Sequence, residues 1–218
     1  MIVPAELSAA RLQRNDINLL LGYDAVAAHV EEHAEPQLRA EYGWPEREAG
    51  WAEHIAELLR DSKSRVWPPG EVQDLVNIKS AYLLRVQAAG LLIAPTEVLA
   101  GCVASLTPAA VMATARGRGW RHFVVKPVPS SWCLNVLRFR VSSAEEGDED
   151  NSRDEEARLR EYLGRALVRG SRELLLQEFV PGLVARPEVR AFFWGEEFLY
   201  AVRPTRPFPL PFPRPFLV

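Results

Sequence analysis

Residues 66–70 read VWPPG, a segment that no regular element can cross. Proline lacks a main-chain N–H and its ring blocks the preceding helical turn, so two adjacent prolines followed by glycine end any helix. The break predicts a boundary between an N-terminal region, residues 1–66, and a larger domain, residues 67–204. Residues 205–218 form a second proline-rich segment. Because proline donates no ladder hydrogen bond, this tail is expected to be polyproline II or disordered.

The N-terminal region is rich in helical patterns. Asp24 is placed to cap a helix over residues 25–34, which ends before a proline. Between residues 48 and 60 the apolar side chains Trp51, Ile55 and the Leu58–Leu59 pair recur on one face at helical spacing. This region is short for a complete α/β domain, and only INLLLGY at residues 17–23 reads as a strand. It is therefore expected to be a partial domain.

The larger domain mixes both kinds of element. Residues 71–90 predict one helix closed by Gly90, and residues 107–119 predict another, capped by Thr107 with proline at its first position. Strands are expected where apolar residues run or alternate between breakers. These are residues 91–99, 121–126, 132–141 and 173–180, followed by a hairpin around Gly195–Glu196. The acidic run 145–156 is expected to be a loop without function that leads into a helix over 154–168. The paired phenylalanines and the tryptophan of the hairpin are expected in a core.

Composition excludes several classes of protein. The chain has 218 residues and a net charge of -3, so nothing global indicates nucleic acid or an anionic membrane as a partner. No apolar run reaches the ~18 residues of a membrane span, and the N-terminus lacks the basic segment of a signal peptide. Cys102 and Cys133 have no partner at zinc or disulfide spacing. A cytoplasmic protein with reduced cysteines is the expectation.

Two lysines are candidates for binding an anion, with an ordinary solvated helix residue (Lys79) and a strand-end charge (Lys126) as the alternatives. Lys79 opens a helix that leads, through Gly90, to a strand and Pro95–Thr96. Lys126 ends the apolar strand HFVVK and is followed by Pro127. An ammonium group at the mouth of a buried strand is suited to put a point charge on an anion.

Two further segments could complete a nucleotide site. In LLLQEFVPG an apolar strand passes into Gln177–Val180 and a turn, which would offer main-chain groups and a flat apolar wall to a purine. In the hairpin, Glu188 and Arg190 face one side of an extended strand, and Arg203 could join them from the second strand. Arginine is suited to bidentate contact with phosphate.

In this order and spacing, the segments resemble the ATP-grasp superfamily, in its glutathione-synthetase-like and D-cycloserine-ligase-like branch. The resemblance covers roughly residues 66–204. It implies an α+β fold in which two α+β subdomains grip a nucleotide cleft. The first subdomain is expected over residues 67–144, and the second, with an incomplete sheet, over residues 152–204.

The resemblance also implies a reaction. Such enzymes use ATP to activate a small carboxylate as an acyl phosphate, which an amine then attacks. Lys79 and Lys126 would contact the phosphates of ATP, with Lys126 also near the adenine. The adenine slot would be formed by Gln177 and by main-chain groups of Glu178 and Val180. Glu188 would bind the ribose or a neighbouring group. Arg190 and Arg203 would be catalytic, stabilising the transferring phosphoryl group.

The sequence departs from the family pattern in two places. The loop after VVKP, expected to be rich in small residues, reads PVPSSW, with Ser130 and Ser131 as the only hydroxyl donors. Family members hold Mg²⁺ with carboxylates beyond the hairpin, but no Asp, Glu or Asn follows Glu197. No metal ligand is therefore assigned, and a truncated ligase is the expectation. An incomplete sheet would also leave an open edge prone to aggregation.

Three functions remain open on the sequence alone. The chain could derive from an ATP-dependent carboxylate–amine ligase, or it could bind nucleotide without catalysis. It could also be an interaction protein whose tail, with its PLPFP motif, docks on a groove that binds polyproline II helices. The sequence leaves the oligomeric state open.

Overall fold

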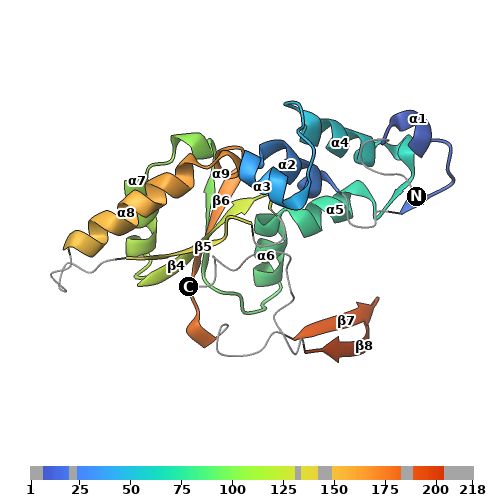
Figure 1. Ribbon diagram of the computed structural model, residues 1–218. Helices are drawn as coiled ribbons and strands as arrows, with labels where there is room; N and C mark the ends of the chain where they lie inside the picture. Colours follow the sequence, from blue (N-terminus) through green and yellow to red (C-terminus); the bar gives the residue numbers. More distant parts are fainter. Residues whose placement is uncertain (1–6, 20–23, 131–133, 142–148, 183–188, 204–218) are drawn as a thin grey trace.

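The computed structural model describes residues 7–19, 24–130, 134–141, 149–182 and 189–203. Over these ranges helices and strands are mixed, and the fold class is α+β, as expected from the sequence. Figure 1 shows a helical N-terminal region beside a sheet flanked by helices, with a separate hairpin below them. Among the described residues, no helix is both long and apolar enough to cross a membrane.

The N-terminal region consists of helices and one two-stranded parallel sheet. Its elements are α1 (Ala9–Leu12), β1 (Asn18–Leu19), α2 (Ala25–His33), α3 (Pro36–Tyr42), α4 (Trp51–Arg60), the 3₁₀ helix η2 (Ser62–Ser64) and β2 (Val66–Trp67). The Asp24 side chain accepts hydrogen bonds from the N–H groups of Val26 and Ala27 at 3.0 and 2.9 Å, so the predicted cap of α2 is confirmed. A small core holds α1, α2 and α4 together through Leu12, Ala28, Ile55, Leu58 and Leu59.

The prediction of a single helix over residues 71–90 is wrong. The structure has two helices, α5 (Gly70–Asn77) and α6 (Lys79–Ala88), separated at Ile78, which has a ψ of 92°. The periodicity of apolar residues indicates only which face of a segment is apolar, and it contains no information about contacts with distant residues. Here the turn at Ile78 lets the next two residues reach the central sheet: Lys79 bonds Ser130, and Ser80 bonds Glu173.

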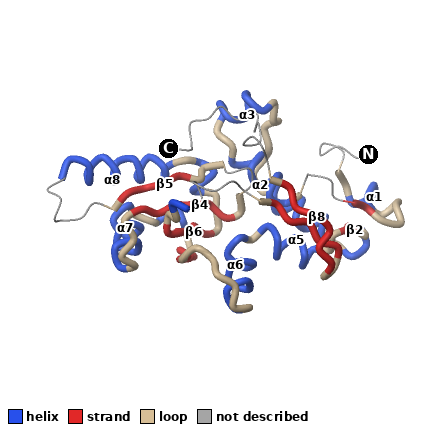
Figure 2. The backbone as a smooth tube through the Cα atoms, turned by 90° about the horizontal axis from the view of Figure 1, so that it is seen from below, coloured by secondary structure: helices blue, strands red, loops and turns tan. Residues whose placement is uncertain are grey.

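A four-stranded antiparallel sheet forms the centre of the larger domain. Its strands lie in the order β3 (Thr96–Ala100), β6 (Glu173–Glu178), β4 (His122–Val128) and β5 (Leu137–Arg140). Helices α7 (Pro108–Gly117) and α8 (Glu149–Gly164) cover one face of this sheet, as the two views in Figures 1 and 2 show. Thr107 caps α7 through the N–H of Ala110, as predicted. The 3₁₀ helix η3 (Val103–Ser105) precedes α7.

The main core lies between the sheet and these two helices. It is built from alternate strand residues, because successive side chains of a strand point to opposite faces. Its largest members include Phe123, Phe139, Tyr162, Leu174 and Leu176, all fully buried. The Tyr162 hydroxyl donates to the main-chain oxygen of Asn135 at 2.8 Å, which satisfies the one polar atom this ring brings into the core.

The acidic run is not a loop over its whole length. Helix α8 begins at Glu149, ahead of the expected start at residue 154, and is followed by the short α9 (Ala166–Arg169). Within α8, Arg158 makes an ion pair with Glu155 at 3.2 Å, one turn back on the same face. The interpretation of the charged run as a solvated linker missed this pairing.

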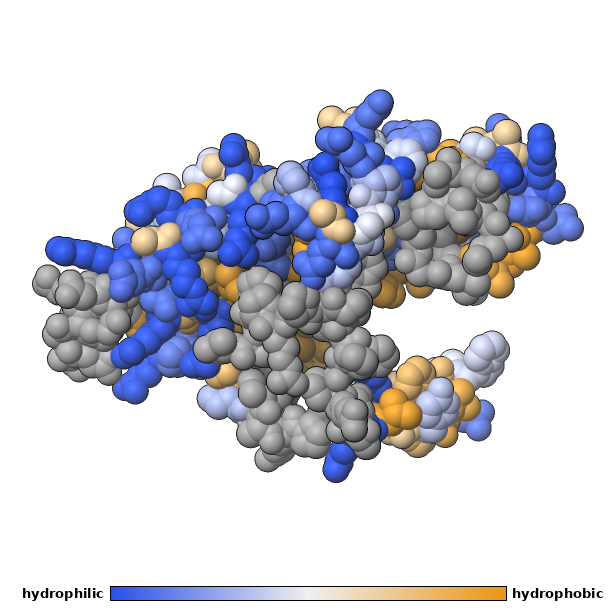
Figure 3. Space-filling view, viewed as in Figure 1, coloured by the Kyte–Doolittle hydropathy of each residue, from blue (hydrophilic) through white to orange (hydrophobic). Residues whose placement is uncertain are grey.

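A hairpin ends the described chain. Strands β7 (Arg190–Trp194) and β8 (Glu197–Val202) pair in antiparallel fashion around Gly195, which has a φ of 61°, and the predicted hairpin is confirmed. The expectation that its aromatic residues lie in a core is wrong: Phe193 is 59% exposed and Trp194 79%. Their apolar side chains face solvent, and Figure 3 shows apolar (orange) residues on the surface of the hairpin.

The N-terminal region and the sheet meet at one tight contact. A Cβ atom on Gly170, between α9 and β6, would lie 1.5 Å from Cδ2 of His33 in α2. Only glycine permits this approach, because any other side chain would overlap the imidazole ring. The contact brings the start of β6 beside α2.

Candidate nucleotide site

Lys126, one of the two predicted cations, lies on one face of the central sheet. Phe123 and Val125 point into the core between the sheet and α7 and α8. By strand alternation, Val124 and Lys126 lie on the opposite face, and Gln177 lies there on the neighbouring strand β6. Lys126 lies within β4, which continues to Val128, and not at the strand's end as the sequence indicated.

The Lys126 ammonium group is held by a chain of side chains on this face. Its Nζ donates to Oε1 of Gln177, whose Nε2 in turn donates to Oγ1 of Thr96 at 2.7 Å. The Thr96 hydroxyl donates to the main-chain oxygen of Ala94 at 2.7 Å. Gln177 is only 8% exposed. The chain of bonds crosses strands β4, β6 and β3, so it fixes the position of the charge by the register of the sheet.

Lys79 reaches the loop that follows β4. Its Nζ donates to the main-chain oxygen of Ser130 at 2.6 Å and to the Ser130 hydroxyl at 2.9 Å. Ser130 is 4% exposed. Lys79 therefore ties the first turn of α6 to the segment expected to cover phosphates, which follows the strand that carries Lys126.

The predicted purine hinge follows directly after this face. The Glu178 N–H donates to the oxygen of Pro95 at 2.9 Å, and the Phe179 N–H donates to the oxygen of His122 at 2.9 Å. The N–H of Glu178 is therefore already used, which leaves its carbonyl as the main-chain group to offer. The Arg138 guanidinium carbon lies 3.9 Å from the centre of the Phe179 ring and covers that side of the hinge. Val180 follows, half-buried and outside any strand.

Two of the remaining predicted residues, Arg190 and Arg203, belong to the hairpin. Arg190 opens β7 opposite Val202 on β8, and Arg203, which is exposed, follows β8. Glu188 lies outside the described residues. On the side shown in Figure 3, an open gap separates the hairpin from the part of the molecule above it.

Metal ligands do not gather anywhere in the part of the chain that the structure describes. Within those ranges, no three His, Cys, Asp or Glu side chains lie close enough together to hold an ion. The residues present there do not form a magnesium site.

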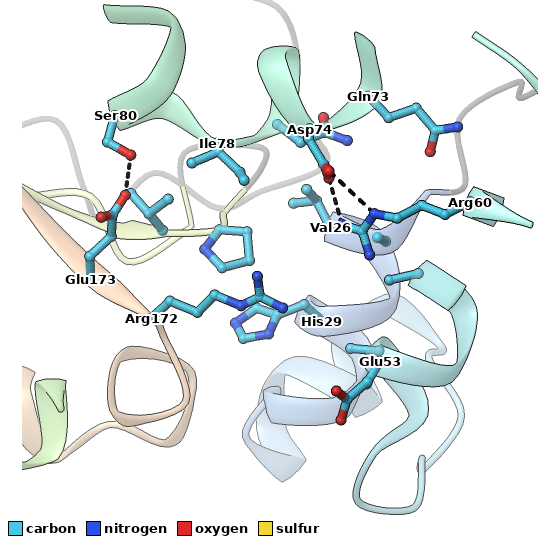
Figure 4. Close-up of a pocket in the computed structure, with 16 residues that line it drawn as sticks. Val26, His29, Glu53, Arg60, Gln73, Asp74, Ile78, Ser80, Arg172 and Glu173 are labelled. Atoms are coloured by element: carbon cyan, nitrogen blue, oxygen red, sulfur yellow. Dashed lines mark hydrogen bonds and ion pairs between the residues drawn. The ribbon is translucent and has the colours of Figure 1, made fainter. Parts of the chain in front are cut away.

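Sequence reasoning missed a second group of polar side chains at the other end of the same strands. His29, Arg172, Glu173 and Ser80 line a cavity beside the contact between α2 and the sheet (Figure 4). Two signals were available. A charged pair, Arg172–Glu173, stands immediately before the apolar run of β6, and a serine follows Lys79.

Comparison with known proteins gave matches in structure only. A scan against protein-family models found none that matches, and a search of curated proteins found no match either. Among solved structures, the D-cycloserine synthetase DcsG is 28% identical to this chain, with a TM-score of 0.50 over 70% of the chain.

Other matches lie further away. The D-alanyl-alanine synthetase A of Vibrio cholerae is 14% identical, with a TM-score of 0.44 over 67% of this chain and 38% of its own. The RimK domain ATP-grasp protein of Sphaerobacter thermophilus is 19% identical, with a TM-score of 0.40 over 63% of this chain and 45% of its own. The chain spans 48% of the length of the D-cycloserine synthetase. The fold is therefore similar to that of the D-cycloserine synthetase, in agreement with the resemblance to the ATP-grasp superfamily that the order of the sequence motifs indicates.

Proposed function

We propose that this chain binds ATP on the sheet face that carries Lys126 and Gln177, as part of a carboxylate–amine ligase of the ATP-grasp type. The observation that carries the proposal is the Lys126 ammonium group, half-buried and oriented by the Gln177 amide. A cation fixed in this way on the face away from the core is suited to an anion, because a lysine serves as a point charge for phosphate.

The placement of the other groups supports a phosphate chain that runs from the hinge toward Ser130. Lys126 lies between the hinge and the loop after β4, and Lys79 holds that loop through Ser130. Adenine would lie at the other end, against the hinge. We assign the carbonyl of Glu178 and the main chain of Val180 to its edge, and Gln177 to the positioning of Lys126.

The catalytic assignments rest on the resemblance and remain proposals. The substrate carboxylate would attack the terminal phosphoryl group of ATP, giving an acyl phosphate and ADP, and an amine would then displace phosphate to form an amide. Arg190 and Arg203 would stabilise the transferring group and Glu188 would bind the ribose, which requires the hairpin to approach the sheet face. We derive no step through magnesium, because the described residues do not form its site.

The experiment that tests the proposal is a thermal-shift titration with ATP, with and without Mg²⁺. A ligand that binds only the folded chain must raise its Tm. We expect the rise for the wild type and its loss in Lys126→Ala. Lys63→Ala is the matched control, because Lys63 is an exposed lysine of η2, outside the sheet. An equal ATP response in all three proteins would refute the assignment of Lys126.

Release of ADP separates the ligase from a protein that only binds nucleotide. With ATP, Mg²⁺, a carboxylate and an amine present, an active ligase releases ADP in proportion to the amide formed. Binding without release under these conditions would refute the ligase half of the proposal and leave the nucleotide site intact. The tail lies outside the described residues, so a role for it in protein interaction stays a prediction.

A further inference from the structure

The hairpin of β7 and β8 carries a continuous set of apolar side chains that the described part of the chain leaves exposed. Every residue of β8 is exposed, as is every residue of β7 after Arg190. The large apolar residues among them are Phe192, Phe193, Trp194, Phe198, Leu199, Tyr200 and Val202. Apolar surface that is gathered in one place, and not scattered singly, generally marks a site of protein interaction.

The outer edges of the hairpin are open as well. Within the described residues, β7 and β8 form a sheet of two strands, and each strand pairs only with the other. Figure 1 shows β8 on the side of the hairpin that faces away from α5 and α6. The main-chain groups along its outer edge can therefore bond to another strand. A hairpin of two strands is at best marginally stable in water, so an added strand would stabilise it.

The charges at its two ends indicate what β8 can pair with. Glu197 begins the strand, and Arg203 follows its last residue. Both side chains are exposed, and neither makes an ion pair with any other residue that the structure describes. Antiparallel pairing places the start of one strand beside the end of the other. A strand that is acidic at its start and basic at its end is therefore complementary to a second copy of itself.

We propose that β8 pairs with β8 of a second copy of this chain, across a two-fold axis at Tyr200, so that two hairpins join into one sheet. The charges select the register. With Tyr200 opposite Tyr200, Glu197 of each copy lies opposite Arg203 of the other, and any shift of the register removes this opposition. The pairing is isologous, which is the usual symmetry of a dimer of identical chains.

The same register gives favourable pairs along the whole strand. Phe198 lies opposite Val202, and Leu199 lies opposite Ala201. Aromatic–aromatic, aromatic–β-branched and opposite-charge pairs each stabilise an antiparallel ladder. All three kinds occur in this pairing, and no two like charges face each other along β8.

The inference concerns the chain without nucleotide and does not rest on the proposed function. Because the pairing engages Arg203, a paired chain could not use that side chain at a phosphoryl group at the same time. The test therefore measures mass in the absence of ATP, and its outcome is separate from that of the ATP titration.

Sedimentation equilibrium of the full chain measures the association. The monomer has a mass of 24.5 kDa, and we expect a species of twice that mass that dissociates on dilution. Glu197→Arg and Arg203→Glu each place like charges opposite each other at both ends of the paired strands. Each substitution is expected to raise the dissociation constant of the dimer by about tenfold or more.

An equimolar mixture of the two variants separates a specific pairing from a general loss of association. In a mixed pair, each introduced charge lies opposite an unlike charge, so the mixture should form the dimer that neither variant forms alone. A folding defect could not produce this rescue. Glu57→Arg on α4 and Arg160→Glu on α8 make the same changes of charge at exposed positions and should leave the dissociation constant unchanged.

Circular dichroism shows that each variant is folded. The proposal is overturned if the folded wild type is monomeric at every concentration at which it stays in solution. It is equally overturned if the association survives both charge reversals, or if the mixture of variants associates no better than either variant alone.

Discussion

Acid is expected to destabilise this protein through one buried histidine. The pKa of His29 is lowered from 6.5 to about 4, mainly by burial and also by the charges of His33 and Arg172, while Glu32 opposes the shift. Below pH 6.5 the unfolded chain binds a proton at this position that the folded chain binds only near pH 4. Between these two values the free energy of unfolding therefore falls as the pH falls. The stabilising contribution is complete above pH 6.5 and lost at about pH 4.

The size of the effect follows from the two pKa values. A difference of one pKa unit corresponds to about 1.4 kcal/mol, so the gap between 6.5 and about 4 corresponds to about 3 kcal/mol. That is a large part of the 5–15 kcal/mol by which domains are commonly stable. His29→Gln removes the titrating group and keeps a side chain that can donate a hydrogen bond.

Urea unfolding followed by circular dichroism, at neutral pH and at about pH 4.5, measures the effect. The wild type should lose about 2–3 kcal/mol more than His29→Gln between the two conditions. His54→Gln replaces an exposed histidine of α4 and should follow the wild type. Parallel losses in the wild type and His29→Gln would refute the reasoning, because the acid sensitivity would then come from other groups.

Three further substitutions test the contacts that hold the fold. Gly170→Ala places a Cβ atom in the ring of His33 and should lower the free energy of unfolding by about 1–3 kcal/mol in chemical denaturation. Gly164→Ala is the control and should be nearly neutral, because nothing lies within 4 Å of the added Cβ atom. Equal effects of the two substitutions would contradict the close approach. Asp24→Ala removes the cap of α2 and should cost about 1 kcal/mol by the same assay. Tyr162→Phe leaves a main-chain oxygen without its 2.8 Å donor and should cost about 1 kcal/mol, while an unchanged midpoint would show that the bond contributes nothing.

Local signals in the sequence predicted the elements whose determinants are local. The caps at Asp24 and Thr107 and the hairpin turn at Gly195 each depend on residues within a few positions, and all three were correct. The resemblance to the ATP-grasp superfamily came from the order of the motifs, which combines several segments of the chain. The α+β class was implied by the same resemblance.

Contacts between distant segments could not be predicted in this way. The helix breaks at Ile78, and the next two residues make hydrogen bonds to Ser130 and Glu173, which lie 50 or more positions away. The periodicity of residues 71–90 cannot indicate these bonds. The close approach of Gly170 to His33 and the cavity at Arg172 also join residues that lie far apart in the sequence. The exposure of the hairpin aromatics was missed for a related reason: an apolar strand predicts burial, but not which partner covers it.

The small number of lysines, two of them hydrogen-bonded at the candidate site, has a chemical consequence. The 26 basic side chains of the protein include three lysines, Lys63, Lys79 and Lys126, and the rest are arginines, which stay protonated and do not react as amines. A reagent that acylates amines therefore modifies only these three side chains and the amino terminus of the chain. Lys63 is exposed, whereas the other two are half-buried and already donate hydrogen bonds. The extent of labelling at Lys79 and Lys126, measured by mass spectrometry relative to Lys63, would thus show whether a ligand occupies the candidate site.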